Sequence, residues 1–223
     1  MKQVIVFLIL GALFSGNTFG QNSKSEQVQT FNKLKTVLDT ILQDDQQNRE
    51  NVVELENRYG WESKEVQDLW KVISQKDSIN LIKVEKILHE YGWLGPGQIG
   101  EEGNETLFLV IQHANIETQD KYLPMLEEAV KNGNAKAGDY ALLKDRVLLR
   151  HGEKQIYGSQ LEIDSRTQKY VLSPMIDPDN VDRRRESVGL MPLAEYLKYF
   201  DLEWDVEKFK KRMAEYDLER IKE

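Results

Sequence analysis

The chain has 223 residues, of which 40% are apolar and 30% charged, and it contains no cysteine. This length suits one domain, since domains commonly contain about 100–200 residues. The lack of cysteine excludes disulfides, thiolate metal sites and cysteine nucleophiles. Because 38 acidic residues outnumber 30 basic ones, the formal net charge is −8. That charge argues against a general nucleic-acid-binding protein, which needs a basic face.

The N-terminal segment, residues 1–20, has the three-part pattern of a secretory signal peptide. Lys2 supplies a positive charge, Val4–Phe14 is almost wholly apolar, and Thr18 and Gly20 occupy the −3 and −1 positions of a cleavage site. An uncleaved membrane anchor is the alternative, but it needs about 20 apolar residues and the run is about half that long. We therefore expect export to a bacterial periplasm or exterior, with no membrane span after cleavage.

Apolar residues recur at three- and four-residue steps along the chain, which predicts amphipathic helices. The first helix is expected over residues 25–43, after which 44–49 are abruptly polar before the apolar pattern resumes at Val52. Ser63 is a good N-cap for the next helix, and Asp77 or Ser78 for the one after it. Further helices are expected at 106–111, which is apolar all round, at 120–131, and at 140–150 with Asp139 as its cap.

Residues 92–103 contain five glycines and are expected to form a loop. Within them, Gly95–Gly100 matches the glycine spacing of dinucleotide-binding turns. Such a turn requires a preceding strand, so that the phosphates sit at the start of a helix within a βαβ unit. Here a helix precedes the segment and Pro96 fills the first gap. We therefore expect a connection between two helices, and no cofactor.

Beyond Gly152 the pattern changes from helical to β-rich. Residues 155–163 and 169–175 flank a polar turn, which predicts a β-hairpin. The remaining expected elements are short helices around 181–187 and 192–200 and an amphipathic C-terminal helix within 201–223, which either lies against the domain or extends from it. The fold class predicted is α+β and predominantly α-helical, with one β-hairpin in the C-terminal half of a single domain over 21–200.

His113 ends the apolar helix and follows Gln112. Two opposed effects act on the protonation of a histidine at the C-terminus of a buried helix: the helix dipole favours its charged form and burial disfavours it. A residue so balanced suits general acid or base catalysis, although a structural histidine with satisfied hydrogen bonds is the alternative. His89 and His151 show no metal-ligand spacing with it, so no metal site is expected.

Asp145 and Arg146 stand in the middle of an apolar helical run, residues 141–149. Neighbouring residues on a helix point about 100° apart, so these two side chains do not easily pair with each other. Each charge therefore needs a partner from elsewhere in the fold. That partner belongs either to a structural ion-pair network or to a functional site.

Polar residues also follow the first predicted strand. Gln155, Tyr157 and Ser159 alternate onto one face, and Gly158 and Gln160 onto the other. A glycine within a strand indicates a bulge or a close approach of another part of the chain. The plain alternative is a strand face that is simply solvated.

Short polar segments occur along the chain in this order: Asp45-Gln46 with Arg49, Asp77 with Asn80, Gly92-Trp93, Gln112-His113, Gln119, Asp145-Arg146, Tyr157-Gly158-Ser159-Gln160, Arg185, Gly189-Leu190 and Pro192. The order resembles a bacterial family catalogued as domain of unknown function 6624, over about residues 40–200. Leu94 and Ser159 depart from its pattern, where proline and threonine are commoner. The resemblance implies one compact domain and marks polar residues of interest, and it implies no activity, substrate or partner.

Two functional hypotheses follow. In the first, His113 is an acid or base oriented by Asp145, and a small polar or anionic envelope-related ligand is either bound or hydrolysed in a pocket formed by Gln112, Arg146, Gln155, Tyr157, Gln160 and Arg185. In the second, the protein is a non-catalytic module that contacts an envelope protein, and the same polar residues form a buried structural network. Ser159 lacks a glycine-framed nucleophile elbow, so serine hydrolase chemistry has no support.

Overall fold

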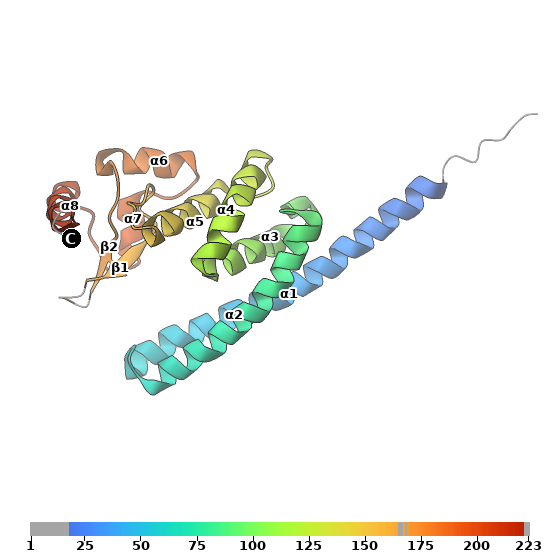
Figure 1. Ribbon diagram of the computed structural model, residues 1–223, viewed down its shortest axis with the longest axis horizontal. Helices are drawn as coiled ribbons and strands as arrows, with labels where there is room; N and C mark the ends of the chain where they lie inside the picture. The colour runs from blue at the N-terminus through green and yellow to red at the C-terminus, as the bar shows by residue number, and fades with distance from the viewer. Residues whose placement is uncertain (1–17, 165–166, 168, 221–223) are drawn as a thin grey trace, which may run out of the picture.

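A computed structural model describes residues 18–220 except 165, 166 and 168. The predicted signal peptide therefore lies outside the described residues, apart from Thr18–Gly20, with which the first helix begins. The described chain is mainly helical, with one two-stranded antiparallel hairpin in its C-terminal half (Figure 1). This confirms the predicted fold class. Among the residues described, no helix is both long and apolar enough to cross a membrane.

The N-terminal half is a set of five helices in which two long ones lie side by side and three shorter ones pack beside them (Figure 1). Their bounds are α1 Thr18–Tyr59, α2 Lys64–Tyr91, α3 Pro96–His113, α4 Ile116–Lys131 and α5 Ala137–Arg150. Ser63 caps α2 as predicted, because its side chain accepts a hydrogen bond from the Val66 amide. Lys136 rather than Asp139 occupies the N-cap position of α5.

Several boundaries differ from the sequence prediction. Helix α1 runs through the polar segment 44–49 without a break. Helix α2 likewise continues through Asp77 and Ser78, because the Ser78 hydroxyl bonds back to the Ser74 carbonyl and Asp77 pairs with another helix instead of capping. The glycine-rich loop is shorter than expected, since α3 already begins at Pro96 and only kinks at Gly100, where φ is +79°.

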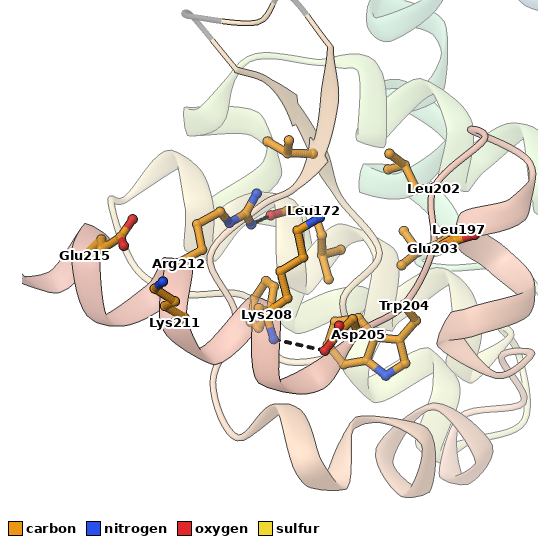
Figure 2. Close-up of a pocket in the computed structure, with 12 residues that line it drawn as sticks. Leu172, Leu197, Leu202, Glu203, Trp204, Asp205, Lys208, Lys211, Arg212 and Glu215 are labelled. Atoms are coloured by element: carbon orange, nitrogen blue, oxygen red, sulfur yellow. Dashed lines mark hydrogen bonds between the residues drawn. The ribbon is translucent and has the colours of Figure 1, made fainter.

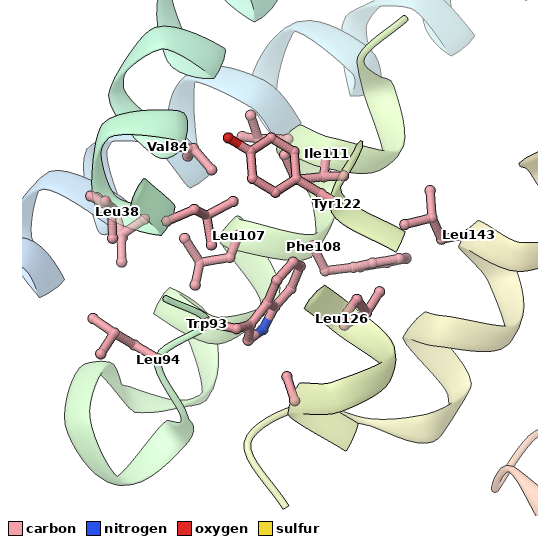
Figure 3. Close-up of a cluster of buried hydrophobic side chains, with 14 of the residues drawn as sticks. Leu38, Val84, Trp93, Leu94, Leu107, Phe108, Ile111, Tyr122, Leu126 and Leu143 are labelled. Carbon is pink, nitrogen blue, oxygen red and sulfur yellow. The ribbon is translucent and has the colours of Figure 1, made fainter. Parts of the chain in front are cut away.

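The larger hydrophobic core lies where these five helices meet. Figure 3 shows Leu38 of α1, Val84 of α2 and Leu143 of α5 converging on the side chains of α3 and α4. Phe108 and its neighbours place α3 at the centre of this core, as the apolar run 106–111 predicts. The polar ends of α3 are thereby fixed against α1, α2 and α5.

The C-terminal half builds a second, smaller core. Its elements are β1 Leu161–Ile163, β2 Tyr170–Leu172, the short 3₁₀ helix Pro178–Asn180 and the helices α6 Val181–Ser187, α7 Leu193–Lys198 and α8 Val206–Arg220. Strand β1 pairs with β2 in the register Leu161 to Leu172. Phe209 and Met213 of α8 are buried in this core, so the C-terminal helix lies against its own chain.

The hairpin strands are shorter than the sequence predicts. Residues 155–160 do not form a strand; Gln155 makes only an isolated bridge to Met175. The prediction of a continuous strand was wrong there because the backbone amides of this segment, here called the 155–160 loop, bond to a buried side chain instead of to a neighbouring strand. Gly158 has φ +66° and its backbone lies against Met175 and Leu193, which is the close approach expected of that glycine.

Candidate functional site

The most distinctive polar pair in the described structure joins the end of α3 to the middle of α1. His113 Nδ1 lies 3.0 Å from Asp45 Oδ1. Asp45 is only 4% exposed, so its carboxylate is enclosed at the helix junction. An ionised carboxylate only accepts hydrogen bonds, so Nδ1 carries the proton of this bond and the other ring nitrogen, Nε2, is left as the acceptor in the neutral histidine.

Asp45 is held in turn by Arg49, one helical turn further along α1. Arg49 donates to both oxygens of Asp45, at 3.2 and 3.3 Å, and both oxygens of Asp77 on α2 lie 2.9 Å from its Nη2. Burial alone would raise the pKa of Asp45, but hydrogen bonds and charge interactions with His113 and Arg49 outweigh it and hold that pKa below its usual value. Asp45 therefore stays ionised near neutral pH and keeps the His113 ring in one orientation.

A pocket of about 280 Å³ adjoins this pair. His113 lines it together with residues of α2 and the start of α4, among them Trp70, Ser74, Asp77 and Asn115. Among the described residues, Nε2 of His113 has no hydrogen-bond partner. A histidine with a carboxylate on Nδ1 and a free Nε2 beside a pocket has the geometry of a general base.

Asp145 does not take the position expected of it beside His113. Its side chain is fully buried at 0% exposure and accepts hydrogen bonds from the amides of Ile156, Tyr157 and Ser159 and from the Ser159 hydroxyl, at 2.7–3.1 Å. The carboxylate that orients His113 is thus Asp45, and Asp145 organises the 155–160 loop. Its partners are mostly backbone amides, which the sequence pattern does not reveal.

Gln155, Tyr157 and Arg185 belong to the same loop structure. Gln155 spans the loop, donating to the carbonyls of Ser173 and Gln160 and accepting from the Gln160 amide. Arg185 is 2% exposed; it donates to the carbonyls of Tyr157, Gly158 and Met191, and its guanidinium lies over the Tyr196 ring. These contacts bring the three predicted residues together around Asp145. They do not bring them to His113.

Arg146 and Gln112 meet at the last turn of α3. Arg146 Nη1 donates to the Gln112 carbonyl at 3.3 Å, while its buried Nε and the buried Gln112 Oε1 have no partner within the described part of the chain. Burial, followed by the charges of Arg150 and Arg49, lowers the pKa of Arg146. No carboxylate among the described residues pairs with it, although an unpaired buried charge is costly.

A second pocket, of about 380 Å³, lies between α5 and the hairpin. Arg146, Arg150 and Gln160 line it, together with Glu153 and Glu162. Gln160 also donates from its amide to the Ser159 hydroxyl, which ties it to the Asp145 loop. Of the predicted ligand-binding residues, Arg146 and Gln160 are therefore the ones that share a pocket.

The sequence prediction of the site left out Asp45, Arg49 and Asp77. For Asp45 and Arg49 the signal was the polar run 44–49 inside a helix whose apolar pattern resumes afterwards. Asp45 and Arg49 are four residues apart and so share one face of α1, and the buried core lies on that side of the helix. A charged pair on the inner face of a helix, such as Asp45 and Arg49, marks a candidate site as well as Asp145 and Arg146 in α5 do.

A third pocket, of about 460 Å³, is formed by the hairpin, α7 and α8 (Figure 2). Figure 2 shows Arg212 reaching from α8 toward the Leu172 carbonyl, to which it donates a hydrogen bond. None of the residues predicted for the site lines this pocket. Its lysines and arginine are balanced by acidic residues of α8 and of the segment before it, so it offers no charge preference.

Asp139, in the first turn of α5, makes the stability of the fold depend on pH. Burial, only partly offset by Lys136 and reinforced by Glu105, raises its pKa to about 6. As the pH rises above 4, Asp139 loses its proton first in the unfolded chain. The free energy of unfolding therefore falls up to about pH 6 and stays constant above it. We expect Asp139→Asn to remove this loss and raise the free energy of unfolding at pH 7 by roughly 1–3 kcal/mol.

Urea unfolding of wild type and Asp139→Asn at pH 4, 5, 6 and 7 measures the effect. The two proteins should differ least at pH 4 and most at pH 7. A difference that is constant over this range would show that Asp139 titrates normally in the fold.

Comparison with known families shows that the chain belongs to DUF6624, a family of unknown function, whose pattern matches residues 32–208. The matched segment includes α2–α7, most of α1 and the start of α8. Comparisons with curated proteins and with solved structures found no match. Family membership thus confirms the resemblance read from the polar segments.

Proposed function

We propose that this member of DUF6624 is an exported bacterial protein in which His113 accepts and returns a proton for a small polar or anionic ligand. The observation that carries the proposal is the His113–Asp45 pair, whose histidine lines a pocket and has no hydrogen-bond partner on Nε2 among the described residues. A carboxylate on one ring nitrogen fixes the tautomer and stabilises the imidazolium that forms on the other. The pattern of residues 1–20 supports export.

The chemistry that fits is hydrolysis or group transfer on an envelope component. Nε2 of His113 takes the proton from an attacking water or hydroxyl and gives it to the leaving group, while Asp45 stays ionised throughout. Arg146, which has no carboxylate partner among the described residues, lines the separate pocket between α5 and the hairpin, where it favours an anionic ligand group.

Ligand discovery by thermal shift tests this proposal. Purified wild type, His113→Ala and Asp45→Asn are screened against phosphorylated sugars, glycerol phosphates and short muropeptides. A ligand present at 100 times its Kd stabilises the fold by about 2.7 kcal/mol, which is readily seen as a rise in Tm. We expect a ligand that shifts wild type, loses its effect in His113→Ala and is consumed only by wild type.

His151→Ala is the matched control, because His151 is an exposed histidine that also pairs with an aspartate, Asp120. It should keep both the shift and the turnover. If every screened compound that shifts wild type also shifts His113→Ala equally and is consumed equally by both proteins, the site of proton transfer does not lie at His113.

Export is tested separately by expressing the full gene product in a bacterial host and sequencing the N-terminus of the protein recovered outside the cytoplasm. We expect the mature chain to begin at Gln21. An uncleaved chain retained in the cytoplasm would contradict this part of the proposal and leave the proton-transfer part standing.

The non-catalytic interaction module remains a second candidate, and the Asp145 loop favours it. Asp145, Gln155 and Arg185 are buried and bonded mainly to backbone groups, as expected of a structural network. If no compound shifts either wild type or His113→Ala, a module that binds another protein becomes the better description.

A further inference from the structure

The surface of α2 is hollowed next to the pocket beside His113. This hollow, about 670 Å³, is lined by Trp61, Trp70, Gln67, Ser74 and Gln75, with Glu56 and Lys71 beside them. Trp70 and Ser74 also line the pocket that contains His113. We propose that this continuous surface, here called the tryptophan groove, binds a neutral oligosaccharide.

Two large aromatic side chains are exposed in the groove. Trp61, in the turn between α1 and α2, is 60% exposed, and Trp70 is 44% exposed. Tryptophan offers the largest apolar face of any residue together with one N–H donor, and leaving that face in water has a cost unless a partner covers it. Trp93, by contrast, is buried in the core.

Apart from the tryptophans, the lining of the groove is polar, and its charges nearly cancel. Gln67, Ser74 and Gln75 supply amide and hydroxyl groups that both donate and accept hydrogen bonds. Glu56 and Lys71 have opposite charges, and Lys71 is also paired with Asp68 at 2.8 Å. An aliphatic protein or lipid surface would cover these polar groups without giving them hydrogen-bond partners.

A sugar ring matches both features. Its C–H face is apolar and stacks on an indole, while its hydroxyl edge pairs with amides, hydroxyls and carboxylates. The net charge of −8 opposes a polyanionic polysaccharide or a nucleic acid, which leaves a neutral oligosaccharide as the favoured ligand.

The shared residues give the ligand a direction. An oligosaccharide lying across Trp61 and Trp70 reaches Ser74 and then the pocket of His113 and Asp77. Only the chemistry at that end rests on the proposed function, since binding along the groove depends on the tryptophans alone.

Titration of the purified full chain with chitohexaose and with cellohexaose, followed by tryptophan fluorescence and calorimetry, tests the inference. Trp70→Ala and Trp61→Ala should each weaken binding about tenfold or more, as truncation of a central aromatic anchor does. Trp70→Phe, which keeps an aromatic face, should recover part of the loss. Ile82→Ala removes another exposed apolar side chain of α2, 70% exposed and outside the groove, and should change Kd less than twofold.

The outcomes separate cleanly. Failure of wild type to bind either hexasaccharide at millimolar concentration, or equal weakening by Ile82→Ala and Trp70→Ala, overturns the inference. Binding to neutral phosphatidylcholine vesicles that depends on both tryptophans, without saccharide binding, overturns it in favour of a membrane-docking surface. His113→Ala should bind the hexasaccharides as wild type does, so the inference stands or fails independently of proton transfer at His113.

Discussion

Replacing Asp145 with alanine is expected to lower the free energy of unfolding by roughly 3–5 kcal/mol. Asp145 is fully buried and collects the amides of Ile156, Tyr157 and Ser159 and the Ser159 hydroxyl. Alanine leaves all these donors buried without an acceptor. It also leaves a cavity the size of a carboxylate.

Urea unfolding followed by circular dichroism measures the loss. Asp145→Asn, which keeps the volume and one acceptor oxygen, should be less destabilising than alanine and clearly worse than wild type. Asp68→Ala is the matched control, since Asp68 is a surface carboxylate paired with Lys64 and Lys71, and its removal should change the free energy of unfolding far less than Asp145→Ala does. If Asp145→Ala lowers the free energy of unfolding as little as this control does, the 155–160 loop is held by contacts other than those with Asp145.

Phe209→Ala is expected to destabilise the protein by about 3 kcal/mol. Phe209 is a buried residue of α8 in the smaller core, and its ring centroid lies 5.4 Å from that of Trp204. The residue also borders the pocket shown in Figure 2, so neighbouring side chains have room to relax and the loss should lie at the low end for a phenylalanine.

The same change should alter the fluorescence of Trp204, which loses its aromatic neighbour. Leu218→Ala, on the same helix but 59% exposed, is the control and should shift stability by less than about 0.5 kcal/mol. Equal effects of the two substitutions would mean that α8 is not held by this contact in solution.

The helices could be predicted because their signal is local. Apolar residues at helical spacing predicted the core faces of α1, α3 and α8, and Ser63 predicted the start of α2. The continuation of α2 through Ser78 could not be predicted, because it depends on Asp77 meeting Arg49 of another helix. A capping residue is recognised from its neighbours in sequence, whereas a salt bridge across helices is not.

The site shows the same limit more strongly. His113 and Asp145 were both selected as unusual polar residues, and both are engaged with charged or backbone partners as expected of such positions. Their partners were wrongly assigned, because the histidine meets a carboxylate that precedes it by 68 residues and the aspartate meets amides. The β-like alternation of 155–160 likewise gave no sign that its amides were committed to Asp145.

The position of Asp145 also makes the C-terminal half of the fold depend on α5. The residue belongs to α5, whose Leu143 and Val147 are part of the larger core, and the loop it holds places Gly158 against Met175 and Leu193 of the smaller one. The smaller core thus packs on a loop whose amide groups bond to a side chain of α5. The C-terminal half should behave as a dependent folding unit, which opens with the rest of the molecule in hydrogen exchange and does not fold when expressed alone.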